Sequence, residues 1–279
     1  YVASGGSETS VPANALAEAD VVVDALLGTG LDRPPGGAVA DAIDAINAAR
    51  TPVLALDVPS GLNADTGTAP GVAVEAAATL SFVARKQGLY TGAARERCGQ
   101  LHFDDLGVPA LAIDAAGTAP AGLLDLNALR AQWLPRRRRG AHKGDFGHVL
   151  VLGGDHGYGG AVCLASAAAA RAGAGLISVA TRPAHVAAVL AGRPEVMARG
   201  VDDTAGLAPL LARASVVAIG PGLGFATFGR ALWAAALDCG RPLVVDADAL
   251  NLLATDPQRN DDWILTPHPG EAARPLGLT

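Results

Sequence analysis

The sequence predicts an α/β protein made of two successive units, each built on a parallel sheet. Short apolar runs typical of buried strands alternate along the chain with stretches of helical spacing. Glycine-rich turns follow several of these strand candidates. The composition combines 50% hydrophobic residues with only 4% aromatic residues and 35 glycines. Such small residues suit helices that pack closely on parallel sheets with tight turns between them.

In the first unit, strands are expected at residues 21–27, 53–57, 78–83 and 99–103. The run at 21–27 has the pattern of a fully buried strand, and the turn that starts at Gly28 ends it. Helical spacing of apolar residues predicts a helix over 38–49, which Pro52 stops. Strand, helix and strand in this order indicate a right-handed parallel crossover.

In the second unit, strands are expected at residues 148–152, 177–181, 215–219, 242–245 and 264–265, with a helix over 161–174. Between the two units, residues 104–135 have a weaker pattern, and an arginine run at 136–139 follows. That run is interpreted as solvated surface. The predicted organisation is a first domain at 1–108, an interdomain connection at 109–140 and a second domain at 141–279.

The formal net charge of −6 argues against a nucleic-acid or membrane surface, because both need a clustered positive field. A small-molecule ligand is therefore expected. Three cysteines stand far apart and match no metal or redox spacing, so reduced thiols in a cytoplasmic protein are expected. The chain starts with Tyr1 and ends soon after Glu271, and we expect a piece of a longer protein truncated at both ends.

Polar clusters end two neighbouring strand candidates of the second unit, at residues 246–251 and 266–271. Open α/β sheets bind ligands at the carboxyl ends of their strands, so both clusters are expected to face one pocket. Two residues of the first cluster, Asp246 and Asn251, could hold a magnesium–phosphate shell or cap the turn. Lys143 and Asp145 could contact a ligand or form a surface pair.

Four ordered motifs lie in the first half of the chain: Asp24-x-x-x-Gly28-Thr29-Gly30-Leu31, Leu56-Asp57-Val58-Pro59-Ser60-Gly61-Leu62-Asn63, Asp65-Thr66-Gly67 and Thr79-x-x-Phe82-x-x-x-Lys86-x-Gly88-Leu89. Each is weak alone, because short glycine turns and strand-end carboxylates are common. Together they resemble the carboxyl-terminal half of the NAD(P)H-hydrate epimerase domain. The resemblance implies a Rossmann-like fold that inverts the C6 hydroxyl of hydrated nicotinamide cofactor.

The same resemblance implies roles for individual residues. Asp24 and Ser60 fall where that family binds a potassium ion. Asp57 falls on a substrate-contacting carboxylate placed for acid–base work, and Lys86 is its electrostatic partner or a surface cation. The family's Asn- and Gly-rich loop lies upstream of these motifs and is absent from this sequence. The substrate-contacting loop corresponds to Gly28, Thr29, Gly30, Leu31, Asp32, Arg33 and Pro34.

The second half resembles the ADP/ATP-dependent NAD(P)H-hydrate dehydratase domain, which has a ribokinase-like α/β fold. The motifs are 142–147 (His-Lys-Gly-Asp-Phe-Gly), 153–161, 220–224 (Gly-Pro-Gly-Leu-Gly), 245–251 and 265–271. The resemblance implies that Ala161, Gly222 and His268 line the pocket for hydrated nicotinamide. For His268 the alternative is capping of the helix that follows, and the substrate role is favoured.

The implied second reaction is a dehydration driven by ADP (or ATP) with magnesium, and the composition favours ADP. In ribokinase-like enzymes the base for this reaction is an Asp in a Gly-x-Gly-Asp turn. That turn does not occur at the expected place before Thr279. We therefore expect the chain alone to be inactive, or nearly so, in both reactions.

The function predicted from the sequence is nicotinamide nucleotide repair by a partial Rossmann-like epimerase domain followed by a partial ribokinase-like domain. The expected partners are the small-molecule substrate and a nucleotide, with a homo-oligomer for the full-length protein. One alternative is a ribokinase-like kinase for a small molecule such as a vitamin precursor. A nucleotide-sensing scaffold is another, which the combination of Asp57, Ser60 and Lys86 disfavours.

Overall fold

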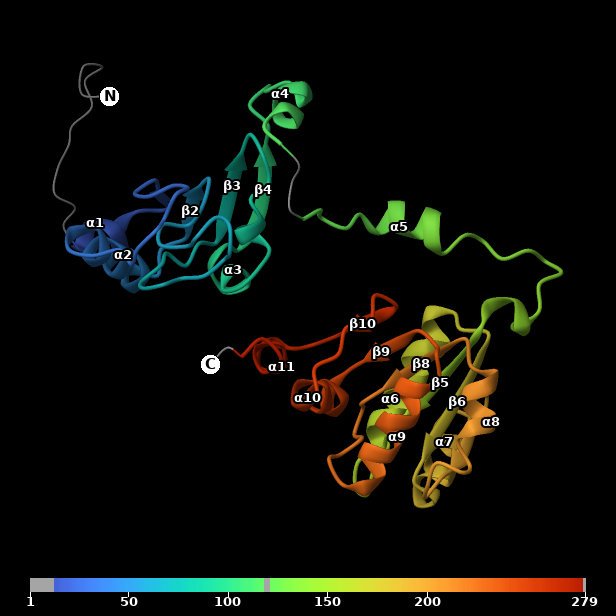
Figure 1. Cartoon of the computed structure of the whole chain (residues 1–279). Coiled ribbons are helices and arrows are strands. Elements are labelled where there is room, and N and C mark those ends of the chain that lie inside the picture. The colour runs from blue at the N-terminus through green and yellow to red at the C-terminus, as the bar shows by residue number, and fades with distance from the viewer. Residues whose placement is uncertain (1–12, 118–120, 278–279) are drawn as a thin grey trace. The chain divides into compact units, whose positions relative to one another are not determined.

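The computed structural model describes residues 13–117 and 121–277, and it divides into two compact units, Tyr1–Trp133 and Leu134–Thr279 (Figure 1). Every strand pairing in both units is parallel, which confirms the predicted α/β class. The division falls inside the stretch expected to connect the domains.

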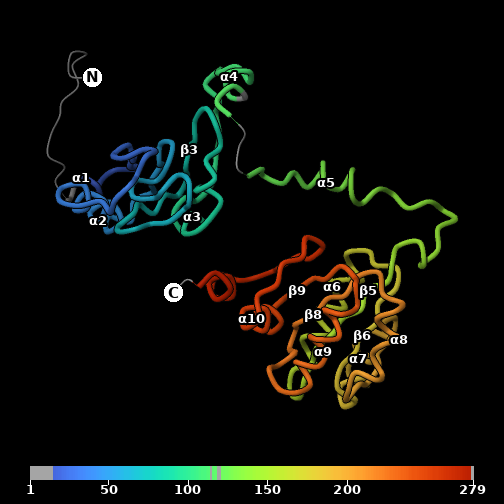
Figure 2. The backbone as a smooth tube through the Cα atoms, in the orientation of Figure 1, coloured from blue at the N-terminus to red at the C-terminus, as the bar shows by residue number. Residues whose placement is uncertain are grey.

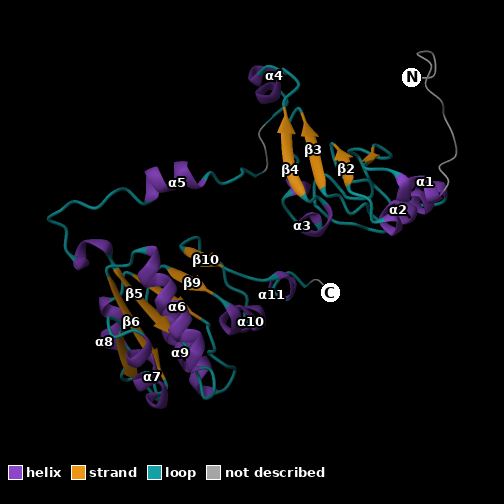
Figure 3. Ribbon diagram, turned by 180° about the vertical axis from the view of Figure 1, so that it is seen from behind, coloured by secondary structure: helices purple, strands orange, loops and turns teal. Residues whose placement is uncertain are grey.

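Strands and helices alternate along the second unit and, apart from one pair of consecutive strands, along the first (Figure 3). The strands are β1 (Val22–Asp24), β2 (Val53–Leu56), β3 (Ala78–Phe82), β4 (Gln100–Asp104), β5 (His148–Leu152), β6 (Leu176–Thr181), β7 (Met197–Gly200), β8 (Val216–Ile219), β9 (Leu243–Val245) and β10 (Trp263–Leu265). The α-helices are α1 (Ala13–Glu18), α2 (Ala38–Ala49), α3 (Ala94–Arg97), α4 (Ala110–Ala115), α5 (Leu126–Trp133), α6 (Gly159–Ala172), α7 (Val186–Gly192), α8 (Ala208–Arg213), α9 (Thr227–Asp238), α10 (Ala247–Thr255) and α11 (Pro269–Ala273). Short 3-10 helices are η2 (Gln87–Leu89), η3 (Lys143–Phe146) and η4 (Pro183–His185).

The first unit has a four-stranded sheet in the order β1-β2-β3-β4. Helix α2 has the predicted bounds and buries Ile43 and Ile46 against Val22 of β1 and Val53 of β2. A second small core forms where η2 and α3 pack on the loop after β2. The carboxyl ends of all four strands therefore lie at one edge, where Asp24 and Asp57 stand.

The first strand is not fully buried, contrary to the sequence pattern. Val21 and Val23 are 52% and 54% exposed, although Val22 packs in the core. The reason is that β1 is an edge strand of the described sheet, and α2 covers its other face. The same correction applies to β10 at an edge of the second sheet, where Ile264 is 64% exposed.

The second unit has a six-stranded sheet in the order β10-β9-β8-β5-β6-β7. Side chains alternate along β5, so Leu150 and Leu152 point into one core while Val151 points into the other. Helices α8, α9 and α10 contribute to the first core and α6 and α7 to the second. The sheet is thus covered by helices on both faces, as in a doubly wound fold.

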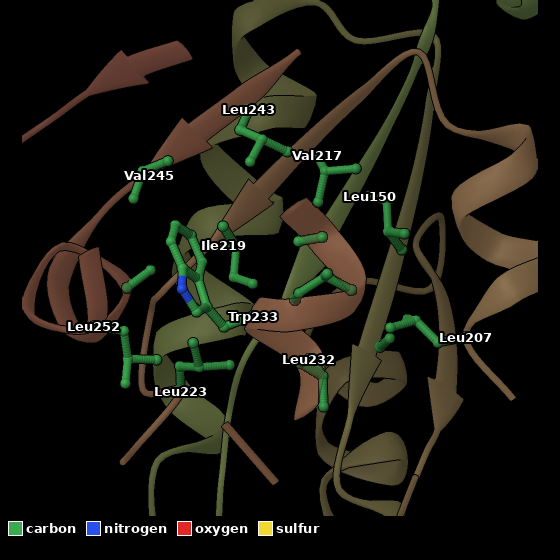
Figure 4. Close-up of a cluster of buried hydrophobic side chains, with 14 of the residues drawn as sticks. Leu150, Leu207, Val217, Ile219, Leu223, Leu232, Trp233, Leu243, Val245 and Leu252 are labelled. Atoms are coloured by element: carbon green, nitrogen blue, oxygen red, sulfur yellow. The ribbon is translucent and has the colours of Figure 1, made fainter. Parts of the chain in front are cut away.

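The larger core of the second unit lies between the sheet and helices α9 and α10 (Figure 4). Trp233 of α9 stands among strand residues such as Ile219 and Val245, and its ring meets Trp263 of β10 edge-on with centroids 6.1 Å apart. This core holds β8 and β9 in register, so their carboxyl ends are fixed relative to each other.

The chain passes from β4 to β5 through the short helices α4 and α5, where the sequence pattern predicts no helix (Figure 2). Leu126 and Trp133 of α5 are exposed, which explains why apolar spacing does not reveal this helix. Strand β7 is also absent from the sequence prediction. It lies at an edge of the second sheet, and its residues are exposed or half-buried rather than continuously apolar.

Candidate functional site

A hollow of about 430 Å³ opens beside the loop that follows β1 in the first unit. Residues 27–36 and Val39 line it, so the whole segment from Gly28 to Pro34 that was expected to contact substrate forms its wall. Gly30 adopts a φ of 87°, a left-handed conformation that favours glycine. The loop can therefore turn back sharply from the strand end.

Asp24 and Ser60, the two residues expected to bind potassium, are in direct contact. The Ser60 hydroxyl donates to Asp24 Oδ1 at 2.6 Å, and the Ser60 backbone N–H donates to Asp24 Oδ2 at 2.8 Å. The backbone N–H of Leu27 in turn donates to Ser60 Oγ at 2.8 Å. This network ties the ends of β1 and β2 to the wall of the hollow.

The chemistry of this network fits a hard monovalent cation. Asp24 is only 1% exposed, and the groups that meet its charge are backbone N–H and hydroxyl donors. A buried carboxylate with such partners gains from a nearby cation. The carboxylate of Asp24, the hydroxyl of Ser60 and the carbonyl of Leu27, 3.2 Å from Ser60 Oγ, supply oxygen atoms of the type that such ions prefer.

Asp57 and Lys86 form a second group of contacts, at the carboxyl ends of β2 and β3. The Lys86 ammonium pairs with Asp57 Oδ1 and also donates to the carbonyl of Phe82 at 2.7 Å. The Phe82 N–H donates to the same carboxylate oxygen at 3.0 Å. Lys86 is therefore a specific partner of Asp57 rather than an unattached surface cation.

The backbone of Asp57 is strained. Its φ of 68° lies in the left-handed region, which residues with a side chain adopt at a cost of about 1 kcal/mol or more. Such conformations persist where the surroundings fix them, and they gather at functional sites. Its N–H donates to the carbonyl of Leu80 at 2.8 Å, which holds the strained residue against β3.

The loop after β2 carries both Asp57 and Ser60, so it connects the Asp57–Lys86 contacts with the Asp24–Ser60 contacts. The side-chain amide of Asn63, in the loop after β2, donates to the carbonyl of Leu31 in the hollow wall at 2.8 Å. Asp57 itself is not a lining residue of the hollow. Lys86 lines a different hollow of about 800 Å³, together with Tyr90 and Phe103.

In the second unit, the structure brings Ala161 and Gly222 together. A Cβ at Gly222 would lie 3.3 Å from Cβ of Ala161, and only 2.6 Å from Cβ of Tyr158. Gly222 also has a φ of 60°. Steric crowding and backbone conformation thus both favour glycine at this position.

His268 caps a helix, which is the alternative that the sequence analysis ranked second. Its Nδ1 accepts hydrogen bonds from the N–H groups of Gly270 and Glu271 at 3.1 and 3.3 Å, and its own N–H donates to Glu271 Oε2 at 3.1 Å. The ring is 64% exposed at the start of α11. Among the described residues, none of its hydrogen bonds reaches Ala161 or Gly222.

The polar clusters that end β9 and β10 do touch each other. The Thr266 hydroxyl donates to Asp246 Oδ1 at 2.9 Å, which joins the two strand ends. Asp246 stands at the start of α10 and precedes Ala247, whose φ is 46°. Asn251 pairs with Arg274.

Lys143 and Asp145 lie at the surface in η3. Asp145 contacts His142 there, with an Nε2–Oδ1 distance of 3.2 Å. This arrangement favours the surface interpretation of the His142–Gly147 segment over a ligand contact.

Three residues to which the sequence motifs assign no role lie on or near the turn at 220–224: Tyr158 and Asp155 contact Gly222, and Arg182 contacts Asp155. Tyr158 is 64% exposed and packs directly on Gly222. Arg182 follows the last residue of β6 and pairs with Asp155 through a bond of 2.7 Å. A polar residue directly after an apolar strand was the signal used for Asp24 and Asp57, and the same signal identifies Arg182.

No helix among the residues that the structure describes combines the length and apolar character needed to cross a membrane.

Comparison with known families assigns the two halves of the chain separately. Residues 149–279 match a family model described as NAD(P)H-hydrate dehydratase, and residues 3–88 match one described as the YjeF-related protein N-terminus. The second unit thus corresponds to the first model and most of the first unit to the second.

Curated relatives match almost the whole chain. A bifunctional NAD(P)H-hydrate repair enzyme of Coxiella burnetii is 50% identical over 96% of this chain and 54% of its own length. The corresponding enzyme of Escherichia coli is 44% identical over 93% of this chain and 50% of its own length. The chain therefore spans about half the length of the curated relatives it matches.

Among solved structures, a hypothetic protein from Streptococcus mutans is similar with a TM-score of 0.53 and 33% sequence identity. The match covers 56% of this chain and 59% of that one.

Proposed function

The chain belongs to the family of bifunctional NAD(P)H-hydrate repair enzymes, and from this premise we propose that its two units serve the two successive repair reactions of one protein. The first unit would take part in epimerising hydrated NADH or NADPH at C6. The second would take part in the ADP-dependent dehydration of the S epimer to NAD(P)H.

One observation carries the proposal: in each unit, residues assigned to the site from segments that follow different strands contact one another. Asp57 meets Lys86 in the first unit, and Ala161 meets Gly222 in the second. A ligand site at the carboxyl edge of a parallel sheet needs residues that follow different strands, far apart in the sequence, to lie next to one another.

In the first unit, Asp57 would hold or move a proton at the C6 hydroxyl, with Lys86 compensating the charge of the carboxylate. Residues 28–34 would contact the substrate along the hollow. Asp24 and Ser60 would hold the potassium ion, which when bound supplies positive charge beside the substrate's oxygen atoms.

In the second unit, Ala161, Gly222 and His268 would contact the hydrated nicotinamide ring. ADP or ATP with magnesium supplies, when bound, the phosphate that makes the C6 oxygen a leaving group. The chain's own residues orient the ring and exclude water around it, which is the larger part of catalysis in phosphoryl transfer. His268 can cap α11 through Nδ1 and still present its exposed ring to a ligand.

Equilibrium binding tests this assignment. We expect the 279-residue chain to bind both epimers of NADPH hydrate, with G222A weakening binding of the S epimer and D57N weakening binding to the first unit. E75Q is the matched control for the first unit, because it removes an exposed ion pair with Arg97. Absence of binding to the unaltered chain, or binding that neither G222A nor D57N weakens, would contradict the proposal.

Turnover by the chain alone is expected to be slight in both reactions. Incubation with both epimers, ADP and magnesium, followed by the absorbance of the reduced nicotinamide, measures it. Full turnover would contradict this expectation. Phosphorylation of an alcohol without loss of water would instead favour a small-molecule kinase.

A cytoplasmic location and a homo-oligomeric state of the full-length protein complete the proposal. The cysteines Cys98, Cys163 and Cys239 are all unpaired, which agrees with a reducing compartment. Burial raises the pKa of Cys98 to about 11, and a hydrogen bond with Thr79 opposes this only in part, so the thiol stays protonated at neutral pH. Fractionation and light scattering of the full-length protein would check the two points.

A further inference from the structure

A mostly buried ion pair, Asp155 with Arg182, stands at the carboxyl edge of the second sheet. Asp155 lies in the turn after β5, and Arg182 directly follows β6. Arg182 Nε donates to Asp155 Oδ1 at 2.7 Å, and the two side chains are only 16% and 17% exposed. Neither residue has a role in the function proposed above.

The environment keeps Asp155 charged. Burial by itself raises the pKa of its carboxyl group, but the hydrogen bond from Arg182, the backbone N–H of His156 and the guanidinium charge together hold the pKa below its ordinary value. The pair is therefore ionised at neutral pH, and each partner compensates the charge of the other.

Other elements fix the orientation of Arg182. Its guanidinium carbon lies 3.9 Å from the ring centroid of Phe228, a buried residue of α9. Its Nη1 atom lies 3.6 Å from Asp202, after β7. A planar guanidinium held against a ring and between two carboxylates loses most of its rotational freedom. Arg182 therefore presents one fixed donor to Asp155.

Asp155 in turn contacts the glycine turn at residues 220–224. Its N–H donates to the carbonyl of Gly222 at 2.6 Å, and the adjacent N–H of Gly154 donates to the carbonyl of Pro221 at 3.0 Å. A Cβ at Gly224 would lie 3.1 Å from Asp155 Oδ2, so the carboxylate covers the backbone of that turn.

The Asp155 turn also leads into α6, which begins next to Ala161. The Tyr158 N–H donates to the carbonyl of Asp155 at 2.8 Å, and the Ala161 N–H donates to the carbonyl of Tyr158 at 3.1 Å. Asp155 thus connects by hydrogen bonds to both Ala161 and Gly222. The turn itself contains Gly153 and Gly154 with φ of 159° and 66°, backbone conformations that residues with a side chain rarely adopt.

We propose that Asp155 and Arg182 are positioning residues: Arg182 fixes Asp155, and Asp155 sets the spacing between Ala161 and Gly222. This inference rests on the proposed function, because it takes those two residues as contacts of the hydrated nicotinamide. The pair acts through the loop geometry and has no chemical step of its own.

The test compares the affinity of the full 279-residue chain for NADPH hydrate among R182Q, D155N, the double variant and R182K. All affinities are measured at a temperature where circular dichroism shows each variant fully folded. We expect R182Q and D155N each to weaken binding about tenfold, or about 1.4 kcal/mol, since a displaced loop loses part of its contact with the ring. The double variant should be no weaker than either single variant, because the pair acts as a unit. R182K should recover part of the affinity.

R193Q is the matched control. It removes a guanidinium from a more exposed pair with Glu195 in the same unit, at 3.4 Å, and should leave the affinity unchanged. The positioning role would be overturned if the losses of affinity in the two single variants added up in the double variant. It would also be overturned if those losses disappeared once differences in melting temperature were allowed for.

G222A separates failure of this inference from failure of the proposed function. If the unaltered chain binds no hydrate, the proposed function fails and the inference with it. If it binds hydrate and G222A weakens binding of the S epimer while R182Q does not change it, the inference alone is wrong.

Discussion

At Gly222, the absence of a side chain decides how closely two loops approach. Cβ of Tyr158 lies 2.6 Å from the place that a Cβ would take, which is closer than real Cβ contacts allow. A larger residue would push the turn at 220–224 away from α6. Gly222, which the family resemblance assigns to substrate contact, therefore also lets Ala161 and the turn at 220–224 lie side by side.

We expect His148 to make the stability of the second unit depend on pH. The residue is only 7% exposed at the start of β5, and its Nε2 lies 2.8 Å from Ser178 Oγ. Burial lowers the pKa of His148 from the usual 6.5. A hydrogen bond with the backbone of Arg213 raises the pKa in part, and the positive charge of Arg213 lowers it further.

We expect stability to fall as pH decreases below about 6.5, because the unfolded chain then binds a proton that the folded chain excludes. The loss continues until the pH passes the lowered pKa of the folded state. Thermal melts between about pH 7 and about pH 5 measure it, and H148Q should give a shallower dependence. H156Q, at an exposed position, is the control and should keep the original slope. An unchanged slope in H148Q would contradict the assignment.

Among the elements, β1 presents apolar side chains at an open edge. Val23 is 54% exposed on a strand that pairs on one side only within the described sheet. Unpaired backbone groups next to exposed valines form a template for pairing with another chain.

We therefore expect V23K to reduce concentration-dependent self-association of the chain, because a charge on an edge strand opposes pairing. Sedimentation velocity over a range of concentrations measures this. L164K is the matched control, since Leu164 is 76% exposed on α6, a helix that packs on the interior strands β5 and β6. Equal effects of V23K and L164K would mean that general charge, rather than the β1 edge, controls association.

The sequence predicts an element well when the pattern that indicates it lies within the residues of that element. Helix α2 was predicted with its correct bounds, because apolar residues recur at helical spacing and Pro52 follows. The exposure of Val23 and Ile264 could not be predicted, because strand order is a tertiary property. The Arg182–Asp155 pair depends in the same way on β5 and β6 lying side by side. The helix-capping geometry of His268 was foreseen as an alternative, and the spacing could not rank it first.

At the scale of the whole molecule, each unit has its own buried cores. Leu62 is 1% exposed in a core of the first unit, and Leu232 is 0% exposed in the large core of the second. A core that draws all its residues from one unit should determine the stability of that unit.

We expect L62A and L232A each to cost about 2–5 kcal/mol, and each to lower a different unfolding transition. Differential scanning calorimetry, with hydrogen exchange to assign the transitions, measures both. L164A, at an exposed site, should change stability by no more than about 0.5 kcal/mol. A single transition that both core variants lower equally would contradict separate cores.

The central place of β5 in the second sheet has a consequence for the order in which that sheet can form during synthesis. β5 pairs with β6 on one side and with β8 on the other, and β6 leaves the ribosome long before β8 does. Three strands, β5, β6 and β7, can therefore assemble first, with one flank of β5 still open. That flank closes only when β8, β9 and β10 arrive. Until then a nascent chain exposes Leu150, Val151 and Leu152, which are buried in the folded unit, to chaperones or to aggregation.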